Sequence, residues 1–316
     1  MKKKEKILVT GGAGYIGSAC VKDLCRKGYQ VEVVDNLSKG RRELVDKKAG
    51  FIKLDILDLE KLKNFIKEKN FDAVIHFASH KDAGASMEDA PLYSENIRAM
   101  INLLDSMVEH SIAKIIFSSS AAVYGDPQYS PADENHPLKP INYYGYTKMA
   151  CEQLMQWYKL IHGIEFVSLR YFNVAGDHGL GYLDPYAKNL FPIIQDVLSG
   201  KREELQIYGD DYETRDGTGV RDYIHLSDLV EAHLKALELE GSDVFNLGTK
   251  EGQSVLEVVR EFEKQSGKKI PRKFVPRRKG DPAELIADSS KAAKKLRWSA
   301  RRGLAEMVES TLRASS

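Results

Sequence analysis

The sequence predicts an α/β fold, in which a doubly wound parallel sheet is joined to a smaller α/β domain. Three observations predict it. Short apolar runs alternate with stretches of helical periodicity from Ile7 to Leu169, a glycine-rich turn follows the first run directly, and the sequence becomes loop-rich after about Asn173. Strands that alternate with helices form a parallel sheet covered on both faces, and right-handed crossovers make it doubly wound.

The elements of the first half are predicted one by one from local patterns. Apolar runs of strand length indicate strands, and we expect them at 7–9, 31–35, 51–54, 73–77, 114–117 and 165–169. Helical periodicity indicates helices, the first of which is ended by a glycine. We expect helices at 16–27, 59–69, 90–110 and 143–161.

The second half predicts a small domain made from two separate segments. Segments 176–186 and 209–219 are rich in glycine, aspartate and tyrosine, which indicates loops. We expect a helix at 190–198, a strand end and a helix over 220–239, a strand at 244–247, and a mainly helical tail over 251–316 with one strand near Phe274. Because no repeat or low-complexity linker marks a boundary, we expect one domain at 1–173, to which 222–248 returns, and a second at 174–221 with 249–316.

Composition and charge exclude several classes of protein. The chain has 316 residues, of which 42% are hydrophobic, and a formal net charge of +1. This balance favours neither nucleic-acid nor membrane partners, and no apolar run approaches the ~20 residues of a membrane span. The apolar stretch after Lys2–Lys4 is too short for a signal peptide. The three cysteines, Cys20, Cys25 and Cys151, show no metal-ligand spacing. We therefore expect buried thiols in the reducing cytoplasm and no bound metal.

The segment Thr10–Gly17 has the features of a phosphate-binding turn. It lies between a strand and a helix, and its glycines at 11, 14 and 17 have the spacing G-x-x-G-x-x-G. Glycine allows unusual backbone angles, lets a pyrophosphate approach the main chain, and lets the helix pack close to the strand. The helix N-terminus supplies N–H groups and positive dipole for the anion. In this context the motif predicts a Rossmann-type dinucleotide site.

Asp35 ends the second predicted strand and indicates which dinucleotide is bound. A carboxylate here accepts both ribose hydroxyls of NAD and repels the 2′-phosphate of NADP. The alternative is a helix cap at the end of the strand. Lys39, Arg41 and Arg42 follow closely and would suit NADP, but a solvated basic loop is our preferred interpretation. NAD is therefore the expected cofactor.

A serine run and a Tyr-x-x-x-Lys pair predict a catalytic group. Ser118–Ser120 follows a predicted strand, at the carboxyl edge where open α/β sheets bind ligands. Tyr144 and Lys148 lie one helical turn apart and share a face. A nearby cation favours phenolate, and moving a phenol from pKa ~10 to near 7 requires roughly 4 kcal/mol. The alternatives are a packed aromatic ring and a surface lysine, but the glycine turn and the sheet-edge serine favour catalysis.

Several motifs together resemble one enzyme family. The extended short-chain dehydrogenases/reductases are similar at Thr10–Gly17, Asp35–Ser38, Ser118–Gly125 and Tyr144–Lys148. More narrowly, the chain resembles the UDP-glucose 4-epimerases. Further matches in the more variable half carry this resemblance, at Leu169–Asn173, Tyr208–Tyr212, Asp216–His225 and Arg277–Asp281. The resemblance covers nearly the whole chain.

The resemblance implies functional residues, matched position by position. The implied catalytic residues are Ser120, Tyr144 and Lys148. Besides Tyr144 and Lys148, the implied NAD-binding residues are Gly11, Gly14, Tyr15, Ile16, Gly17, Asp35, Asn36, Asp55, Ile56, Phe77, Ala78, Lys81, Asn96 and Phe172. Besides Ser120 and Tyr144, the implied UDP-sugar residues are Asn173, Asn189, Leu190, Gln206, Tyr208, Arg221, Arg278, Asp281 and Leu285. Two arginines, Arg221 and Arg278, suit a diphosphate, the less favoured alternative being surface ion pairing.

The chain also departs from the pattern of the family. Ser79 stands where the epimerases usually have glycine, and His80 and Asp82 are unusual in the same segment. Tyr143 replaces the usual proline before Tyr144. These departures concern the cofactor loop and remove no catalytic group.

The resemblance implies NAD-dependent 4-epimerisation of a UDP-hexose, which interconverts UDP-glucose and UDP-galactose through a transient 4-keto sugar. Tyr144 would take the proton of the sugar 4-hydroxyl, with Ser120 bonded to the same oxygen. NAD would stay bound, because the cycle has no net redox change. An NDP-sugar 4,6-dehydratase would need an acid pair where this chain has Ala121 and Ala122. Epimerases of UDP-pentoses, UDP-uronates or UDP-N-acetylhexosamines remain alternatives, whereas a non-catalytic NAD(P)-binding regulatory protein would be expected to lack Tyr144 or Lys148.

Two finer expectations concern substrate breadth and assembly. Leu285 matches a position that abuts the sugar's 2-position in the related family. We expect it to admit UDP-glucose and UDP-galactose readily and UDP-N-acetylglucosamine poorly, the alternative being a packing role in the small domain. The helices at 90–110 and 143–161 carry apolar residues on more than one face. In the related family two such helices pair with their copies, which implies a homodimer.

Overall fold

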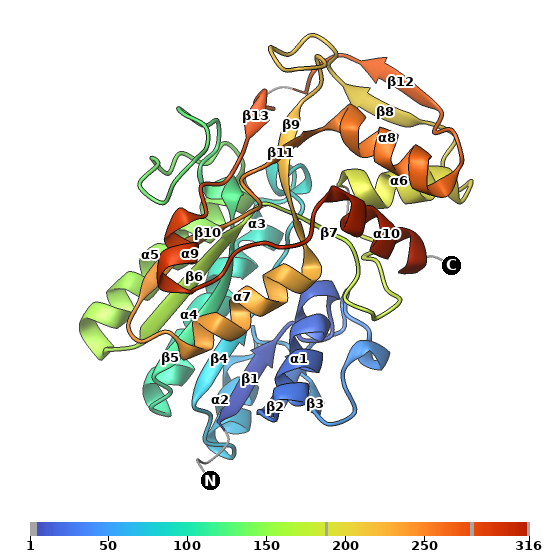
Figure 1. Ribbon diagram of the computed structural model, residues 1–316. Coiled ribbons are helices and arrows are strands. Elements are labelled where there is room, and N and C mark those ends of the chain that lie inside the picture. The colour runs from blue at the N-terminus through green and yellow to red at the C-terminus, as the bar shows by residue number, and fades with distance from the viewer. Residues whose placement is uncertain (1–4, 187–188, 279–280, 315–316) are drawn as a thin grey trace. The chain divides into compact units, whose positions relative to one another are not determined.

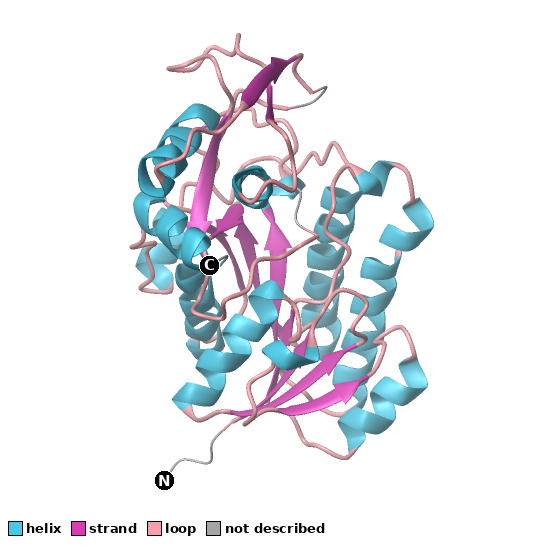
Figure 2. Ribbon diagram, turned by 90° about the vertical axis from the view of Figure 1, so that its right-hand side faces the viewer, coloured by secondary structure: helices cyan, strands magenta, loops and turns pink. Residues whose placement is uncertain are grey.

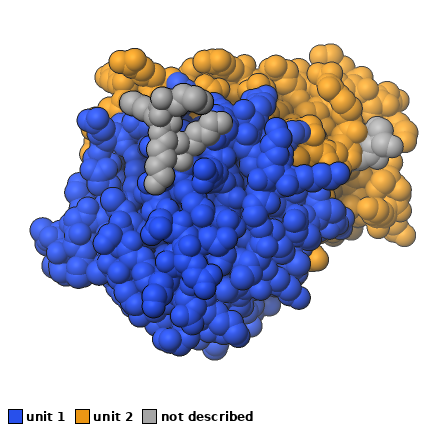
Figure 3. Space-filling model, turned by 90° about the horizontal axis from the view of Figure 1, so that it is seen from below, with its two compact units in different colours: residues 1–125, 140–170, 232–245 blue, residues 126–139, 171–231, 246–316 orange. Residues whose placement is uncertain are grey.

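The computed structural model describes residues 5–186, 189–278 and 281–314. The chain divides into two compact units, which Figure 3 colours separately. Unit 1 contains the residues up to Gly125, 140–170 and 232–245, and unit 2 contains 126–139, 171–231 and the residues from Asn246 on. The predicted domain boundaries differ from these units, because 126–139 and 222–231 lie in unit 2. Tertiary pairing explains the first difference: Ala132 forms a β-bridge with Ala287, and the Asn246 side chain donates to the Ala132 carbonyl.

Unit 1 is built on a seven-stranded sheet with the strand order β10-β6-β5-β4-β1-β2-β3. Its strands are β1 (Lys6–Thr10), β2 (Gln30–Asp35), β3 (Gly50–Lys53), β4 (Ala73–His76), β5 (Lys114–Ser120), β6 (Glu165–Tyr171) and β10 (Asp243–Leu247). β1 pairs in parallel with β2 and β4, and β2–β3 and β4–β5 are also parallel. The reversal of order at β1 is that of a doubly wound dinucleotide-binding sheet, which confirms the predicted fold class.

Helices flank the large sheet on both of its faces (Figures 1 and 2). They are α1 (Tyr15–Lys27), α2 (Leu59–Lys67), α3 (Ala90–Tyr93), α4 (Glu95–Glu109), α5 (Tyr143–His162) and α7 (Leu226–Glu238), with 3₁₀ turns η1 (Arg42–Leu44), η2 (Ala85–Met87) and η3 (Ala121–Val123). Their ends follow ordinary capping chemistry: Asp58 and Asn142 accept backbone N–H groups at the starts of α2 and α5, and Gly28 and Gly163 end α1 and α5 at positive φ.

The core of unit 1 explains why the predicted apolar periodicity folds as it does. Leu8 and Val74 from the sheet pack in one cluster with Leu104 of α4 and Met155 of α5, and all four are almost fully buried. Each such side chain contributes roughly 1.5–3 kcal/mol when it leaves water. Buried strands and helices that each bury one face therefore pack into a single core. This core holds in place the sheet edge at which the candidate site lies.

Unit 2 contains two smaller sheets. In one, β9 (Val220–His225) pairs with β7 (Asn173–Ala175), β11 (Gly252–Ser254) and β13 (Glu284–Leu285), and in the other β8 (Leu205–Tyr208) pairs with β12 (Arg272–Val275). Its helices are α6 (Leu190–Leu198), α8 (Val255–Ser266), α9 (Ser290–Lys295) and α10 (Leu304–Ala314). In its core the ring of Phe191 contacts the rings of Tyr223 and Phe262.

Three sequence predictions of secondary structure need correction. The expected single helix at 90–110 is divided at Ser94, whose hydroxyl donates to the Ala90 carbonyl and bonds the Tyr143 hydroxyl. The serines expected after a strand are its last three residues, because β5 runs to Ser120. The tail is less helical than expected, since β11 and β13 join β9 there. No helix in the described part of the chain has the length and apolar character needed to cross a membrane.

Candidate active site

The glycine turn lies between β1 and α1, as the sequence predicts, and its glycines allow close backbone approaches. A Cβ on Gly11, which has φ +73, would lie 2.5 Å from the Ala78 nitrogen. A Cβ on Gly17 would lie 2.2 Å from the Gly11 carbonyl oxygen. A side chain at either position would therefore displace the turn from the sheet edge. Gly14 has open space around its own Cβ position apart from one contact at 3.4 Å.

The start of α1 suits an anionic group. Its N-cap residue, Gly14, supplies no side-chain hydrogen bond, and the first turn of α1 contains no acidic residue. The starts of α2, α5 and α8 are instead capped by Asp58, Asn142 and Ser254. The implied residues Tyr15 and Ile16 lie in this first turn of α1. The backbone donors and dipole of this turn match the chemistry of a dinucleotide pyrophosphate.

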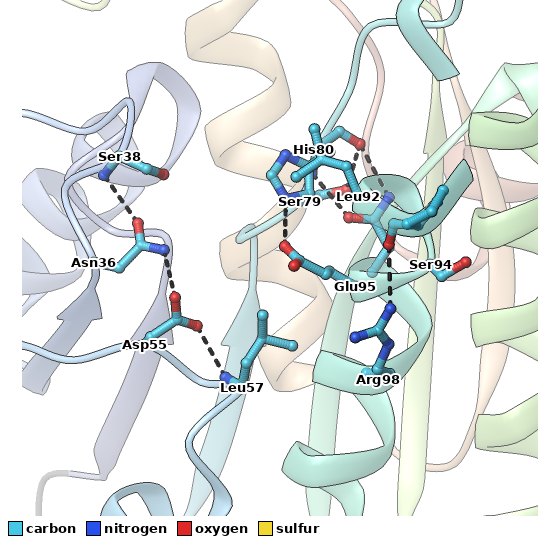
Figure 4. A network of polar contacts seen from close by, with 12 residues as sticks. Asn36, Ser38, Asp55, Leu57, Ser79, His80, Leu92, Ser94, Glu95 and Arg98 are labelled. Atoms are coloured by element: carbon cyan, nitrogen blue, oxygen red, sulfur yellow. Dashed lines mark hydrogen bonds and ion pairs between the residues drawn. The ribbon is translucent and has the colours of Figure 1, made fainter. Parts of the chain in front are cut away.

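Asp35 is held at the end of β2 by the backbone of the glycine turn. Its carboxylate accepts the Ala13 N–H at 3.0 Å and the Leu37 N–H at 2.9 Å. Asn36 next to it is exposed and donates to Asp55, which in turn accepts the Leu57 N–H (Figure 4). A carboxylate keeps further acceptor capacity after two such bonds. The donors and acceptors present therefore fit a dinucleotide with a free ribose, and the bond between Asn36 and Asp55 places a second carboxylate near Asp35.

Lys148 is buried on α5 and fixed beside β5. Its ammonium donates to the Ser118 carbonyl at 2.8 Å and lies 4.8 Å from the ring centroid of Phe117 and 5.7 Å from that of Tyr144. Gly145 lets α5 begin against η3, because a Cβ there would lie 2.4 Å from the Ala122 oxygen. Ser120, the last residue of β5, accepts the Ala122 N–H in the same turn. The structure thus brings the elements of the three implied catalytic residues together.

Burial sets the protonation behaviour around Lys148. Desolvation lowers the pKa of Lys148 to about 8, against the attraction of Cys151 and Glu152. His76 on β4 is also buried, and desolvation followed by repulsion from Lys148 lowers its pKa to about 3. His76 is therefore a neutral imidazole at physiological pH, with Nδ1 2.7 Å from the Thr10 hydroxyl. Lys148 is the cation of this cluster, and it remains protonated below pH 8.

A buried ion pair that the motifs did not reveal supports this arrangement. Glu152, one turn after Lys148, accepts from Ser119 at 2.6 Å and is paired with Arg170 on β6 at 2.5 Å. Arg170 also donates to the Tyr124 hydroxyl at 3.0 Å. Burial opposes the charge of Arg170, but its bonds to Glu152 outweigh this and raise its pKa above the ordinary value. The sequence contains one indication of this pair: Glu152 follows Lys148 by four residues, so the two side chains share a face of the predicted helix.

The loop after β4 abuts the glycine turn. Phe77 and Ala78 both donate their N–H groups to the Thr10 carbonyl, and the Phe77 ring contacts His233 of α7 at 4.8 Å. Lys81 is exposed further along this loop, and Ile56 is buried after β3. Asn96 is buried, and its side-chain amide bonds the His80 backbone and the Thr147 hydroxyl. The implied cofactor residue Phe172 lies in unit 2.

In unit 2 the implied sugar-nucleotide residues gather along β9. Arg221 on this strand forms an ion pair with Asp281 at 3.6 Å and is the register partner of Leu285 on β13. Asn173 on β7 donates to the Asp222 carbonyl on β9 at 3.3 Å. These four residues come from three segments that the sequence separates widely. A cation, a carboxylate and an amide in this arrangement suit a polar, anionic ligand.

Two further groups of implied residues lie in unit 2. The Arg278 guanidinium stacks 3.7 Å from the ring centroid of Tyr208, whose hydroxyl donates to Gln206 at 3.0 Å. The Asp281 N–H donates to the Arg278 carbonyl, which connects this stack to Arg221. Asn189 is the N-cap residue of α6 next to Leu190, and its buried Oδ1 atom has no hydrogen-bond partner among the described residues.

Among the described residues, no group of three or more His, Cys, Asp and Glu side chains is close enough to hold a metal ion.

Comparison with known proteins decides the family. Residues 7–248 match the model of the NAD dependent epimerase/dehydratase family. The chain belongs to this family. It is therefore an NAD-dependent enzyme, and the implied family resemblance and the expected cofactor are confirmed.

Three relatives illustrate how much of the chain is matched by known proteins, and in each the match covers almost the whole length of both proteins. The UDP-glucose 4-epimerase of Bacillus subtilis (strain 168) is 44% identical over 328 aligned residues, which cover 98% of this chain and 96% of that protein. The UDP-glucose 4-epimerase of Brucella ovis, solved in complex with NAD, has a TM-score of 0.95 at 37% identity and 98% coverage of both chains. That of Bifidobacterium longum, solved with NAD+ and UDP, has a TM-score of 0.92 at 40% identity, covering 98% of this chain and 97% of that one.

Proposed function

We propose that the protein is a UDP-glucose 4-epimerase, which interconverts UDP-glucose and UDP-galactose and keeps NAD bound. The observation that carries the proposal is the buried Lys148 held beside Tyr144 and the end of β5. Near full-length similarity to UDP-glucose 4-epimerases supports the choice of substrate class.

The chain's own residues have distinct roles in this proposal. Tyr144, with its ring next to the Lys148 ammonium, takes the proton from the sugar 4-hydroxyl and later returns it. A cation at this distance favours the phenolate form of the base. The Ser120 hydroxyl bonds the same sugar oxygen and orients it. No other residue of the described cluster is better suited as base, because burial keeps His76 neutral with its pKa near 3 and its Nδ1 bonded to Thr10.

NAD, when bound, supplies the acceptor and donor of hydride for C4 of the sugar. The glycine turn and the start of α1 would hold its pyrophosphate, and Asp35 would bind the adenosine ribose hydroxyls. Phe77, Ala78 and Lys81 on the loop after β4, together with Asn36 and Asp55, would complete the site.

In unit 2, Arg221 and Arg278 would bind the UDP diphosphate, and Asp281 the uridine ribose. Asn173, Asn189, Leu190, Gln206 and Tyr208 would line the remaining site. The buried Asn189 Oδ1, which has no partner among the described residues, supports this assignment, because a nucleotide-sugar hydroxyl would satisfy it. Leu285 would limit the space at the sugar's 2-position.

A specific observation argues against the dehydratase alternative. The positions after Ser120 that a 4,6-dehydratase would fill with acids are Ala121 and Ala122, and they form the η3 turn against which α5 begins. Epimerisation of other UDP-sugars remains the second candidate, because the site residues are common to it.

We further propose that the protein works in the cytoplasm as a homodimer. All three cysteines are buried and form no disulfide, which suits a reducing compartment. The exposed apolar side chains Trp157, Leu160 and Ile161 on α5 support an interface between copies.

The proposal is tested by mixing the protein with UDP-galactose and following UDP-glucose by NMR. We expect conversion without added NAD, because the purified protein carries its own. Tyr144→Phe keeps the ring and removes the ionisable oxygen, so kcat should fall by at least ~10²-fold. Tyr146→Phe, on an exposed position of the same helix, is the matched control and should behave like wild type. No conversion by wild type, or full activity in Tyr144→Phe, would contradict the proposal.

A further inference from the structure

The loop after β4 and the start of α5 contact the same short segment of the chain. Residues 94–96 lie where α3 meets α4. The imidazole of His80 lies 3.0 Å from the Glu95 carboxylate, and the Tyr143 hydroxyl lies 2.7 Å from the Ser94 hydroxyl. His80 of the loop after β4 and Tyr143 at the start of α5 thus bind two adjacent residues, Glu95 and Ser94.

Asn96, the third residue of this segment, binds both sides through its amide. It accepts the His80 N–H at 2.8 Å and donates to the His80 carbonyl at 3.0 Å. It also donates to the Thr147 hydroxyl at 3.1 Å, and Thr147 donates to the Tyr144 carbonyl at 2.7 Å. We call residues 94–96 with His80 and Tyr143 the junction clamp. Three successive residues therefore connect the loop after β4 with the catalytic helix.

The loop held by the clamp touches the glycine turn directly. Phe77 and Ala78 donate to the Thr10 carbonyl at 2.9 and 3.2 Å. A Cβ on Gly11 would lie 2.5 Å from the Ala78 nitrogen, so no space separates the loop from the turn. Displacement of His80 would therefore be transmitted over two residues to the backbone against which the glycine turn is packed.

We propose that the His80–Glu95 pair slows the release of NAD by holding the loop after β4 against the glycine turn. This pair is the first arm of the junction clamp. The Ser94–Tyr143 bond is its second arm, and it positions the start of α5, which carries Tyr144. The first arm depends only on the use of NAD by the family. The second arm rests on the proposed epimerase function.

The expected size of the effect follows from exposure. The side chains of His80 and Glu95 are 25% and 31% exposed, so their charge-assisted bond is partly screened by water. Removing one hydrogen bond of this kind should change the equilibrium between the held and the released loop by about three- to ten-fold. Because Asn96 bonds the His80 backbone independently, removal of the pair should loosen the loop without unfolding it.

The first arm is tested on NAD exchange in the absence of sugar. Protein loaded with radiolabelled NAD+ is diluted into excess unlabelled NAD+, and the bound label is followed by filtration. We expect His80→Leu and Glu95→Gln each to release label about three- to ten-fold faster than wild type. Glu109→Gln, which removes the ion pair with Lys63 at the other end of α4, is the matched control and should release NAD at the wild-type rate. Equal release from wild type, His80→Leu and Glu95→Gln would overturn the proposal.

The second arm is tested by measuring, in the same variants, both kcat and the rate of NAD release. Tyr143→Phe should lower kcat by a factor of about three to ten, with NAD exchange changed less than in Glu95→Gln. Tyr158→Phe removes another phenol bond between α5 and α4, to Asp105, and is the matched control. Unchanged kcat in Tyr143→Phe, or the same loss in Tyr158→Phe, would show that Tyr143 has no positioning role. Because label exchange needs no sugar, a protein that failed to epimerise would still test the first arm.

Discussion

Lys148 shows how a single residue sets function against stability. Its ammonium is almost fully buried, with one hydrogen bond to the Ser118 carbonyl and two ring faces around it. Burial lowers its pKa to about 8 from the ordinary value of 10.5. The unfolded chain solvates this charge fully, so the charged form destabilises the folded state. The cation that would favour the Tyr144 phenolate is therefore kept at a cost to folding.

We expect Lys148→Met to stabilise the NAD-free protein at pH 7 by about 1–3 kcal/mol, because the fold no longer holds a buried charge. Between pH 8 and 10.5 the unfolded wild type binds more protons at this position than the folded protein does. The stability contributed by this residue therefore rises with pH through that window, and its full cost is present below pH 8. The difference in free energy of unfolding between Lys148→Met and wild type should therefore shrink from pH 7 to pH 10.

Urea unfolding of the NAD-free proteins at pH 7, 8.5 and 10 measures this difference. Lys159→Met replaces an exposed lysine on the same helix and should show no comparable change with pH. A Lys148→Met protein that is less stable than wild type at pH 7, with a gap that does not depend on pH, would contradict the expectation. It would mean that the bond to Ser118 outweighs desolvation.

At the scale of elements, one buried ion pair connects α5 to two strands. Glu152 of α5 contacts Ser119 of β5 and Arg170 of β6, and both charged residues are at least 95% buried by side chain. Ser119 stands between Ser118, which binds Lys148, and Ser120. The pair therefore fixes the helix that carries Tyr144 against the strand end that carries Ser120.

We expect Glu152→Gln to destabilise the protein by about 3–5 kcal/mol, because Arg170 is left as an uncompensated buried charge. The double variant Glu152→Gln/Arg170→Met removes that charge and should be more stable than Glu152→Gln alone by about 1–3 kcal/mol. Urea unfolding of the wild type, both single variants and the double variant gives the coupling energy.

The exposed Glu309–Arg313 pair on α10 provides the contrast, since its removal should change stability by less than about 0.5 kcal/mol. If Glu152→Gln had an effect as small as this, the buried pair would not be what joins α5 to the sheet.

The elements that the sequence predicts well are those whose signal is local. The glycine turn, Asp35, the serine run and the Tyr-x-x-x-Lys pair each lie within one short segment, and each is found on the expected strand end or helix. The strands β7, β11 and β13 have two or three residues each and exist only because they pair with β9. Such short pairings leave no periodic pattern in the sequence.

The contacts that the sequence could not predict are those made across the fold. The division of the predicted 90–110 helix at Ser94 depends partly on a hydroxyl of Tyr143. The pairings of Glu152 with Arg170 and of His80 with Glu95 were equally unpredictable, because no sequence pattern relates the two members of either pair. Long-range side-chain bonds of this kind are fixed by the fold rather than by local propensity.

At the scale of the molecule, the chain passes between its two units several times. Unit 2 takes residues from three segments, and one of these, 126–139, interrupts the sequence of unit 1 between β5 and α5. The proposed cofactor residues other than Phe172 belong to unit 1, and the residues proposed for UDP-sugar, apart from Ser120 and Tyr144, belong to unit 2. Each unit is therefore assembled from segments that are separated in the sequence by parts of the other unit.

The exposed face of α5 predicts how two copies assemble. Trp157, Leu160 and Ile161 are 61%, 74% and 66% exposed, and residues three and four apart in a helix form one face. Apolar side chains gathered in this way usually mark an interaction surface, because their exposure to water is unfavourable. We expect wild type to be a homodimer by light scattering at micromolar concentration.

Trp157→Glu/Leu160→Glu should convert the dimer to a monomer, because four charges, two from each copy, would be buried at the contact without partners. Phe274→Glu, which places a charge on an exposed aromatic position of β12 in unit 2, is the matched control and should leave the dimer intact. A wild type that scatters as a monomer, or a double variant that remains dimeric, would show that copies do not meet through this face. In the second case the exposed face of α5 would have to serve a different contact, since the dimer would form without it.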